Sequence, residues 1–123
     1  MESSILNLFR HAENIKTFAA GETIFTEGST GREMYVVLEG SVDIQVCNKT
    51  LDVTGPGGVF GEMALIDSSA RSATAIAKDD CTLAIVDERK FLRMAEQTPL
   101  FMLNVMKILA GRLRRMDAML SVG

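Results

Sequence analysis

The sequence predicts a single, mainly β domain, a barrel or sandwich, with helices at both ends. Three observations predict this class. Short runs that favour β-strands alternate with glycines between residues 21 and 61, as they do in barrels and sandwiches. Apolar residues recur at helical spacing mainly near the two ends of the chain. The length of 123 residues suits one domain spanning residues 1–123.

The first element is expected to be a short amphipathic helix over residues 4–14. Its apolar residues recur at helical spacing, and Ser3 or Ser4 can cap its first turn. These apolar residues are Ile5, Leu6, Leu8, Phe9 and Ala12. Strands are then expected at residues 23–25, 33–38, 41–46, 50–54, 72–77 and 81–87.

The runs at residues 33–38 and 41–46 flank Glu39 and Gly40, and the second run alternates apolar and polar side chains. A two-residue connection that contains glycine is typical of an antiparallel hairpin. The sequence therefore predicts that these two strands pair with each other, with Gly40 at the turn.

The C-terminal part predicts a helix over residues 88–97 and, after a break at Thr98 and Pro99, a longer helix over residues 99–120. Proline suits the first turn of that helix, where its missing N–H group costs nothing. Six apolar residues of the longer helix are spaced alternately by four and three positions, which is a heptad seam: Met102, Met106, Leu109, Leu113, Met116 and Leu120. The seam favours a homodimer formed through this helix.

A helix that packs only on its own domain also carries apolar residues every three or four positions. The other side of this helix contains Leu103, Ile108 and Ala110, so both faces have apolar character. A purely intramolecular contact is therefore the alternative to the homodimer. The four cations Lys107, Arg112, Arg114 and Arg115 are expected to form a solvated basic face on the same helix.

Bulk properties exclude several classes of protein. The composition, 47% hydrophobic and 24% charged, is that of a globular protein and not of a disordered one. The net charge of −3 argues against direct nucleic-acid binding, because affinity for a phosphate backbone comes from clustered Lys and Arg. The sequence contains no apolar run long enough to cross a bilayer and no secretory leader. We therefore expect no membrane segment and a cytoplasmic location.

The remaining reactive side chains give no sign of metal or redox chemistry. Cys47 and Cys81 are far apart and form no CxxC spacing, so both are expected to be reduced thiols in the core. His11 is the sole histidine, and no cluster of metal ligands accompanies it. No segment combines a nucleophile, a base and an orienting group, so we expect neither a catalytic residue nor enzyme activity.

The segment at residues 57–75 carries the recognisable chemistry. Glycines are followed by a short helical turn at residues 62–65 and then by Arg71. Exposed N–H groups at a helix start, together with a guanidinium, suit one phosphate group. Glu62 would repel a phosphate, but it can accept a hydrogen bond from a hydroxyl of the same ligand. A ribose phosphate satisfies both side chains, whereas the sequence has no GxxxxGK[ST] loop for a nucleoside triphosphate.

The run Phe60-Gly61-Glu62-Met63-Ala64-Leu65-Ile66, followed by Arg71-Ser72-Ala73-Thr74, resembles the cyclic nucleotide-binding domain family. The resemblance begins at about Phe18 and continues into the C-terminal helix. It implies an antiparallel β-roll, a double-stranded jelly-roll barrel, over about residues 15–87, with a short N-terminal helix and two C-terminal helices. It also implies a regulatory domain that binds a cyclic nucleotide and moves its C-terminal helices in response.

The resemblance assigns roles to residues of the same segment. Glu62 is similar to the residue that accepts the ribose 2′-hydroxyl, and Arg71 to the one that pairs with the cyclic phosphate. Ser72 resembles the neighbour that donates its hydroxyl and amide groups. Because a threonine at this position is associated in the family with cyclic GMP, Ser72 gives weak support for cyclic AMP. The other residues implied to contact the ligand are Phe60, Gly61, Met63, Ala64 and Ala73.

Two positions depart from the family pattern. Ala70 stands where many members have a proline before the arginine. The cyclic AMP receptor protein caps the purine with hydroxyl side chains late in the long helix, but the matching stretch here contains none. A base cap could instead come from Arg114, Arg115 or Met116.

The expected function is therefore a cyclic nucleotide sensor, with cyclic AMP as the favoured ligand, cyclic GMP as the other candidate, and no further cofactor. Two alternatives concern the protein in which this domain works. One is the ligand-binding part of a transcription regulator without its helix-turn-helix domain. The other is the regulatory domain of a cyclic nucleotide-gated channel.

Overall fold

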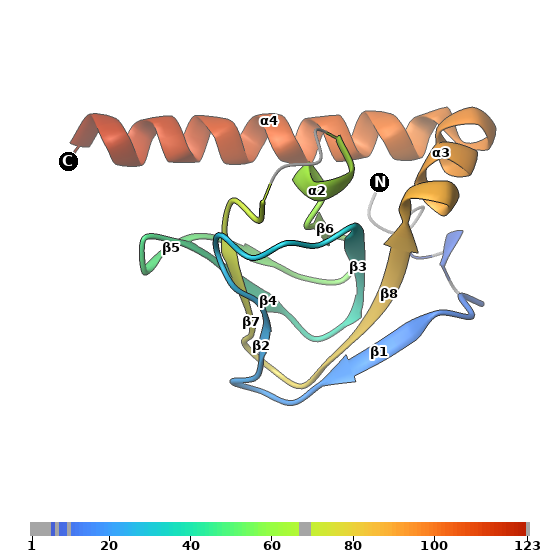
Figure 1. Ribbon diagram of the computed structural model, residues 1–123, viewed down its shortest axis with the longest axis horizontal. Coiled ribbons are helices and arrows are strands. Elements are labelled where there is room, and N and C mark those ends of the chain that lie inside the picture. The colour runs from blue at the N-terminus through green and yellow to red at the C-terminus, as the bar shows by residue number, and fades with distance from the viewer. Residues whose placement is uncertain (1–5, 7, 10, 67–69, 123) are drawn as a thin grey trace.

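Glycine turns divide the chain into short strands that form two four-stranded antiparallel sheets, shown in Figure 1. The computed structural model describes residues 6, 8, 9, 11–66 and 70–122, the last three by their backbone alone. One sheet has the order β1-β8-β3-β6 and the other β2-β7-β4-β5. The strands are β1 (Ile15–Phe18), β2 (Thr23–Phe25), β3 (Glu33–Glu39), β4 (Val42–Val46), β5 (Lys49–Thr54), β6 (Val59–Phe60), β7 (Thr74–Ala77) and β8 (Cys81–Asp87).

Three helices accompany the sheets in the described part of the chain: α2 (Met63–Ile66), α3 (Glu88–Gln97) and α4 (Pro99–Val122). The predicted β-roll with two C-terminal helices is confirmed. The strand expected to start at residue 72 begins at Thr74, and β1 and β6 were not expected as strands. The helix expected over residues 4–14 lies partly outside the described residues. Of those described, Leu6 and Leu8 are helical and residues 11–14 are not.

The predicted hairpin of β3 and β4 is wrong. β3 pairs with β8 and β6, whereas β4 pairs with β5 and β7, so the two strands belong to opposite sheets. Tyr35 and Val37 of β3 instead meet Val42 and Ile44 of β4 face to face in one buried cluster. The run of four buried residues in β3 explains this position, because both faces of the strand need cover.

Gly40 lies where the chain crosses from one sheet to the other. Its φ is +82°, and a Cβ there would lie 2.3 Å from the carbonyl oxygen of Asp80. The neighbouring crossing from β7 to β8 is tied to it, because the Lys78 N–H donates to the Ser41 carbonyl oxygen at 2.9 Å. The Ser41 hydroxyl also donates to Asp79 at 2.5 Å. The glycine therefore permits close packing of two crossings and does not form a hairpin turn.

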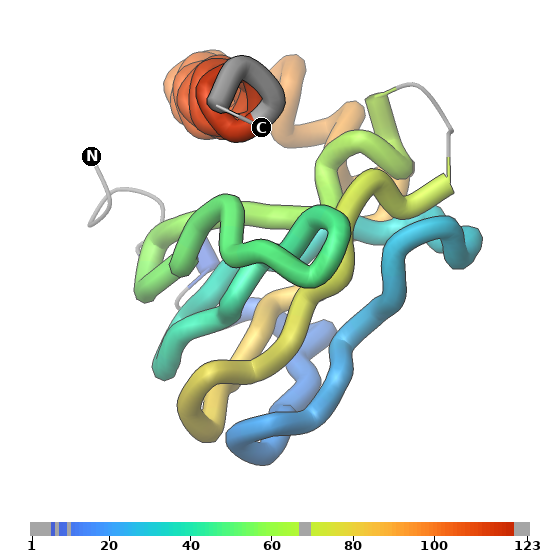
Figure 2. Tube along the Cα trace, turned by 90° about the vertical axis from the view of Figure 1, so that its left-hand side faces the viewer, coloured from blue at the N-terminus to red at the C-terminus, as the bar shows by residue number. Residues whose placement is uncertain are grey.

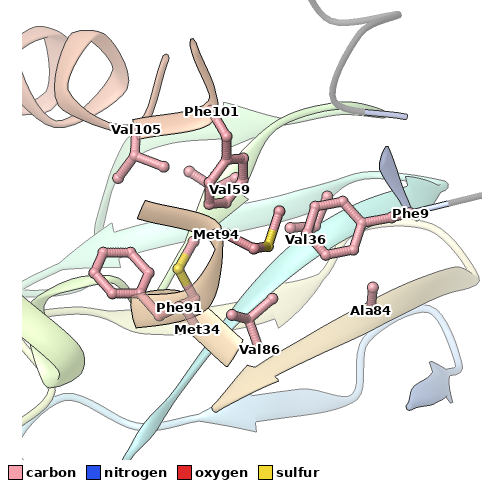
Figure 3. Close-up of a cluster of buried hydrophobic side chains, with 10 residues drawn as sticks. All are labelled: Phe9, Met34, Val36, Val59, Ala84, Val86, Phe91, Met94, Phe101 and Val105. Carbon is pink, nitrogen blue, oxygen red and sulfur yellow. The ribbon is translucent and has the colours of Figure 1, made fainter. Parts of the chain in front are cut away.

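Two buried clusters hold the fold together. One fills the space between the two sheets. The other lies between the sheet containing β3 and β8 and the C-terminal helices, as Figure 3 shows. Its members are Phe9, Met34, Val36, Val59, Ala84, Val86, Phe91, Met94, Phe101 and Val105. Because β3 supplies residues to both clusters, this strand is central to the whole core.

The C-terminal helices are fixed at their starts. Asp87 caps α3 by accepting a hydrogen bond from the Lys90 N–H at 2.8 Å. α4 then runs over the β-roll, and Figure 2 shows this helix end-on above the sheets.

In the part of the chain that the structure describes, no helix has the length and apolar character needed to cross a membrane.

The two cysteines have different environments. Cys81 is buried as expected, and its burial raises the pKa of its thiol. Cys47 is exposed, so the expectation that it lies in the core is wrong. It occupies the tight turn between β4 and β5, where its φ is +52°. Its place in this two-residue turn, and not its hydrophobicity, decides its exposure.

Candidate functional site

The eight residues expected to contact the ligand all line one cavity of about 230 Å³ between the β-roll and α4. They are Phe60, Gly61, Glu62, Met63, Ala64, Arg71, Ser72 and Ala73. β6, the connection from β6 to α2, α2 itself and the segment before β7 supply them. The carboxylate and the guanidinium singled out from the sequence therefore share one hollow.

Arg71 is held by backbone carbonyls. Its Nη1 donates to the carbonyl oxygens of Glu33 at 2.8 Å and Gly61 at 3.0 Å. Its guanidinium carbon lies 4.1 Å from the centroid of the Phe25 ring. Gly31 is also close, because a Cβ there would come within 2.4 Å of Arg71 Nη2. These contacts fix the orientation of the guanidinium, and none of them comes from an acidic side chain.

The charge of Arg71 is left without a counter-ion among the described residues. Burial lowers the pKa of Arg71, and the nearby Tyr35 and Glu33 partly offset this effect. Its Nε is buried and has no hydrogen-bond partner in the described part of the chain. A buried donor without a partner is costly. The site is therefore electrostatically prepared for an anion.

Glu62 lies at the start of α2, where its carbonyl oxygen accepts from the Leu65 and Ile66 N–H groups. Its side chain is only 5% exposed. The carboxylate oxygens lie 3.2 and 3.4 Å from Nη1 of Arg112. A buried carboxylate is stable only when it is paired or hydrogen-bonded. Arg112 thus keeps Glu62 available as a hydrogen-bond acceptor at the cavity wall.

Arg112 is the residue of the site that the sequence analysis missed. It was expected on a solvated basic face, but it is 7% exposed, which corrects that prediction. Its Nε lies 3.2 Å from an oxygen of Asp52, and its Nη2 donates to Thr54 Oγ1 at 2.8 Å and to the Val59 carbonyl at 2.6 Å. One guanidinium therefore ties α4 to β5, β6 and the start of α2.

A signal for Arg112 was present in the spacing of α4. Phe101, Val105 and Ile108 face the β-roll, and Arg112 continues their spacing of four, three and four positions. A cation on the apolar side of a helix needs a buried partner. The spacing and the charge together predict a buried Arg112 with an acidic partner, but they do not predict which carboxylates it meets.

The far end of the cavity is apolar. Leu109, Leu113 and Met116 of α4 line it together with side chains of β4 and β5, namely Ile44, Val46 and Leu51. Of the three expected base-cap residues, Met116 lines this cavity and the other two do not. Arg114 is exposed, and Arg115 points to Asp52 at 3.7 Å. The hollow can therefore hold a ligand with one anionic group, a hydroxyl donor and a flat apolar part.

Comparisons with known proteins agree with this geometry. The sequence model of the cyclic nucleotide-binding domain family matches residues 15–98. The cyclic AMP receptor protein of Thermus thermophilus is 35% identical over 107 residues, which cover 83% of this chain and 50% of that protein. The chain therefore spans half the length of this relative.

Solved structures show the same fold. The catabolite activator protein of Thermus thermophilus aligns with a TM-score of 0.78 at 31% identity, over 97% of this chain and 58% of that one. An EAL enzyme in its cyclic GMP-bound form aligns with a TM-score of 0.66 at 33% identity, over 85% of this chain and 29% of that one. Each of these chains extends beyond the part that matches.

Proposed function

The chain belongs to the cyclic nucleotide-binding domain family, a family of regulatory domains, and we propose that this member binds cyclic AMP in the cavity of Glu62 and Arg71. One observation carries the proposal: Glu62, a buried acceptor that is paired, and Arg71, a buried cation without an acidic partner among the described residues, line the same hollow of about 230 Å³. A cyclic ribose phosphate offers a hydroxyl to the first and a single negative charge to the second.

Arg71 is suited to the cyclic phosphate because its remaining donors have no acidic partner in the described part of the chain. Ser72 lines the cavity next to it and can add its hydroxyl group. Glu62 is suited to the 2′-hydroxyl because Arg112 holds its carboxylate without using all of its acceptor positions. The two residues together account for the phosphate and the ribose of the ligand.

The apolar end of the cavity favours adenine over guanine. Both purines carry an exocyclic amino group, but guanine also presents a ring N–H, which costs free energy if it is buried without an acceptor. The side chains of Ile44, Val46 and Leu51 supply no acceptor, and the sulfur of Met116 is only a weak one. Met116 can cover the face of the purine in place of a hydroxyl cap. Cyclic GMP is the competing ligand and is expected to bind more weakly.

We expect α4 to transmit nucleotide binding to the rest of the protein. Glu62 is the residue that would receive the ribose and is also the partner of Arg112 on α4. A ligand shifts a conformational equilibrium only by binding one arrangement more tightly than the other. Because the hydroxyl and the guanidinium share one carboxylate, nucleotide binding changes how strongly α4 is held. We place this output in a larger cytoplasmic regulator, a transcription regulator or a cyclic nucleotide-gated channel.

We also propose that α4 pairs with the same helix of a second copy. Met106 and Leu113 of the heptad seam are 56% and 58% exposed, and Leu103 beside them is 41% exposed. Side chains of this size gain stability when they leave water. The side of α4 that packs on its own domain contains Phe101 and Val105. Leu109, Leu113 and Met116 of the seam line the nucleotide cavity, so the partner helix would cover the exposed part of the seam at Met106 and Leu113.

Calorimetric titration with cyclic AMP, cyclic GMP and 5′-AMP tests the ligand. Arg71→Ala should abolish measurable binding, because a charge-assisted contact and its geometry are both lost. Arg114→Ala removes an exposed cation outside the cavity and should leave the affinity unchanged. Equal affinity of the parent and Arg71→Ala for cyclic AMP would refute the assignment. Conversion of cyclic AMP to AMP during incubation would refute a purely regulatory role.

A further inference from the structure

A second cavity, of about 340 Å³, lies along the flank of α4 that faces β5 and the turn at residues 55–58. We call it the α4 groove and define it by Asp52, Val53, Asn104, Lys107, Ile108 and Arg112. Among the described residues, only Arg112 lines both this groove and the cavity of Glu62. The proposed nucleotide site makes no use of the other residues of the groove.

Asn104 supplies a polar group to the groove. The residue is 7% exposed, and its side-chain amide makes no hydrogen bond within the described part of the chain. The amide is not among the buried side-chain atoms of that part that lack a partner, so it is open to the groove. Its two donors and its acceptor are therefore available to a molecule in the groove.

Lys107 gives the groove a net positive charge. It lies one turn after Asn104, lines the same groove, and makes no ion pair with a described residue. Asp52 is the only carboxylate of the groove among these residues, and it already contacts Arg112 at 3.2 Å and Arg115 at 3.7 Å. The charge that remains unmatched is thus the Lys107 ammonium, which favours an anionic ligand.

The rest of the wall is apolar or bare backbone. Val53 and Ile108 contribute aliphatic side chains. Glycines at positions 55, 57 and 58 leave the backbone of the turn uncovered, so a ligand can approach closely. Pockets for small molecules commonly combine such apolar walls with a few polar groups that fix orientation. A ligand here needs a carbon chain as well as a charge.

We propose that the α4 groove binds a small organic carboxylate. The carboxylate would pair with the Lys107 ammonium and accept from the Asn104 amide, while its carbon chain would lie against Val53 and Ile108. An inorganic anion would satisfy Lys107 but would leave these apolar walls uncovered. Because the groove shares only Arg112 with the other cavity, the proposal holds or fails independently of cyclic AMP binding.

Titration of the isotope-labelled full chain with sodium butyrate, at constant ionic strength, tests the proposal by nuclear magnetic resonance. The side-chain amide signal of Asn104, identified by its absence in Asn104→Ser, should shift in a saturable way, together with the backbone amides of Gly57 and Gly58. Lys107→Gln should weaken this binding about tenfold, the effect of one charge-assisted contact. The same spectra show whether each variant is folded.

Arg114→Gln is the matched control, because Arg114 is exposed on the same helix and does not line the groove. It should bind butyrate as the parent does. The absence of a saturable shift, or unchanged affinity in Lys107→Gln, would overturn the proposal. Inorganic phosphate that binds as tightly as butyrate would also overturn it, because the apolar walls would then contribute nothing.

Discussion

Arg112→Leu should lower the free energy of unfolding by about 3–5 kcal/mol, the usual cost of breaking a buried ion pair by removing one partner. The variant leaves the carboxylate of Glu62, whose side chain is 5% exposed, without its counter-charge. It also removes the donors to Thr54 and to the Val59 carbonyl. Because such domains have only about 5–15 kcal/mol of free energy of unfolding in total, a decrease of this size should be easily measured.

Urea unfolding followed by circular dichroism measures this loss. Glu62→Gln in the Arg112→Leu chain removes the uncompensated charge and should restore about 1–3 kcal/mol. Arg114→Leu, which changes an exposed cation of the same helix, is the control and should unfold at nearly the parent midpoint. If Arg112→Leu also unfolds at that midpoint, the buried ion pair does not tie α4 to the β-roll and the reasoning is refuted.

Three further predictions rest on single positions. Gly31→Ala places a Cβ 2.4 Å from Arg71 Nη2 and would displace the guanidinium. Calorimetry should show cyclic AMP binding weakened about tenfold, with little change in melting temperature. Unchanged affinity would contradict the role of that guanidinium. Gly40→Ala should lower the free energy of unfolding in urea by at least about 1 kcal/mol more than Gly21→Ala does. Both glycines have positive φ, but only a Cβ at Gly40 would meet a neighbouring backbone atom. Equal losses would contradict this packing. Cys47 should be the one thiol per folded chain that reacts rapidly with a thiol-reactive dye, since the other is buried with a raised pKa, and two rapid thiols would show that the core is open.

The site was more predictable from the sequence than the strand pairing. Glu62 and Arg71 are nine positions apart on either side of a short helical turn, so local chemistry alone suggested one anion site with a hydroxyl acceptor. The structure brings both to one cavity. Most strand positions could also be predicted, because glycines and β-favouring runs are local features.

Long-range contacts were beyond sequence reasoning. Arg112 contacts Asp52 and Glu62, which lie 60 and 50 positions before it in the sequence. No local sequence pattern predicts these contacts. The β3–β4 error has the same origin, because a short glycine connection is compatible with a hairpin and with a crossing between sheets. The buried residues on both faces of β3 decide between them, and that burial is a property of the assembled domain.

The pairing of β1 with β8 and of β2 with β7 has a consequence for how the protein is made. The first two strands pair with the last two, so the sheet of β2 cannot be completed before Ala77 is added, and the sheet of β1 and β3 cannot be completed before Asp87 is added. Until then the apolar side chains of β3 have no lasting cover, which exposes the nascent chain to aggregation. Translation speed and chaperone access should therefore govern the yield of native domain more than its final stability does.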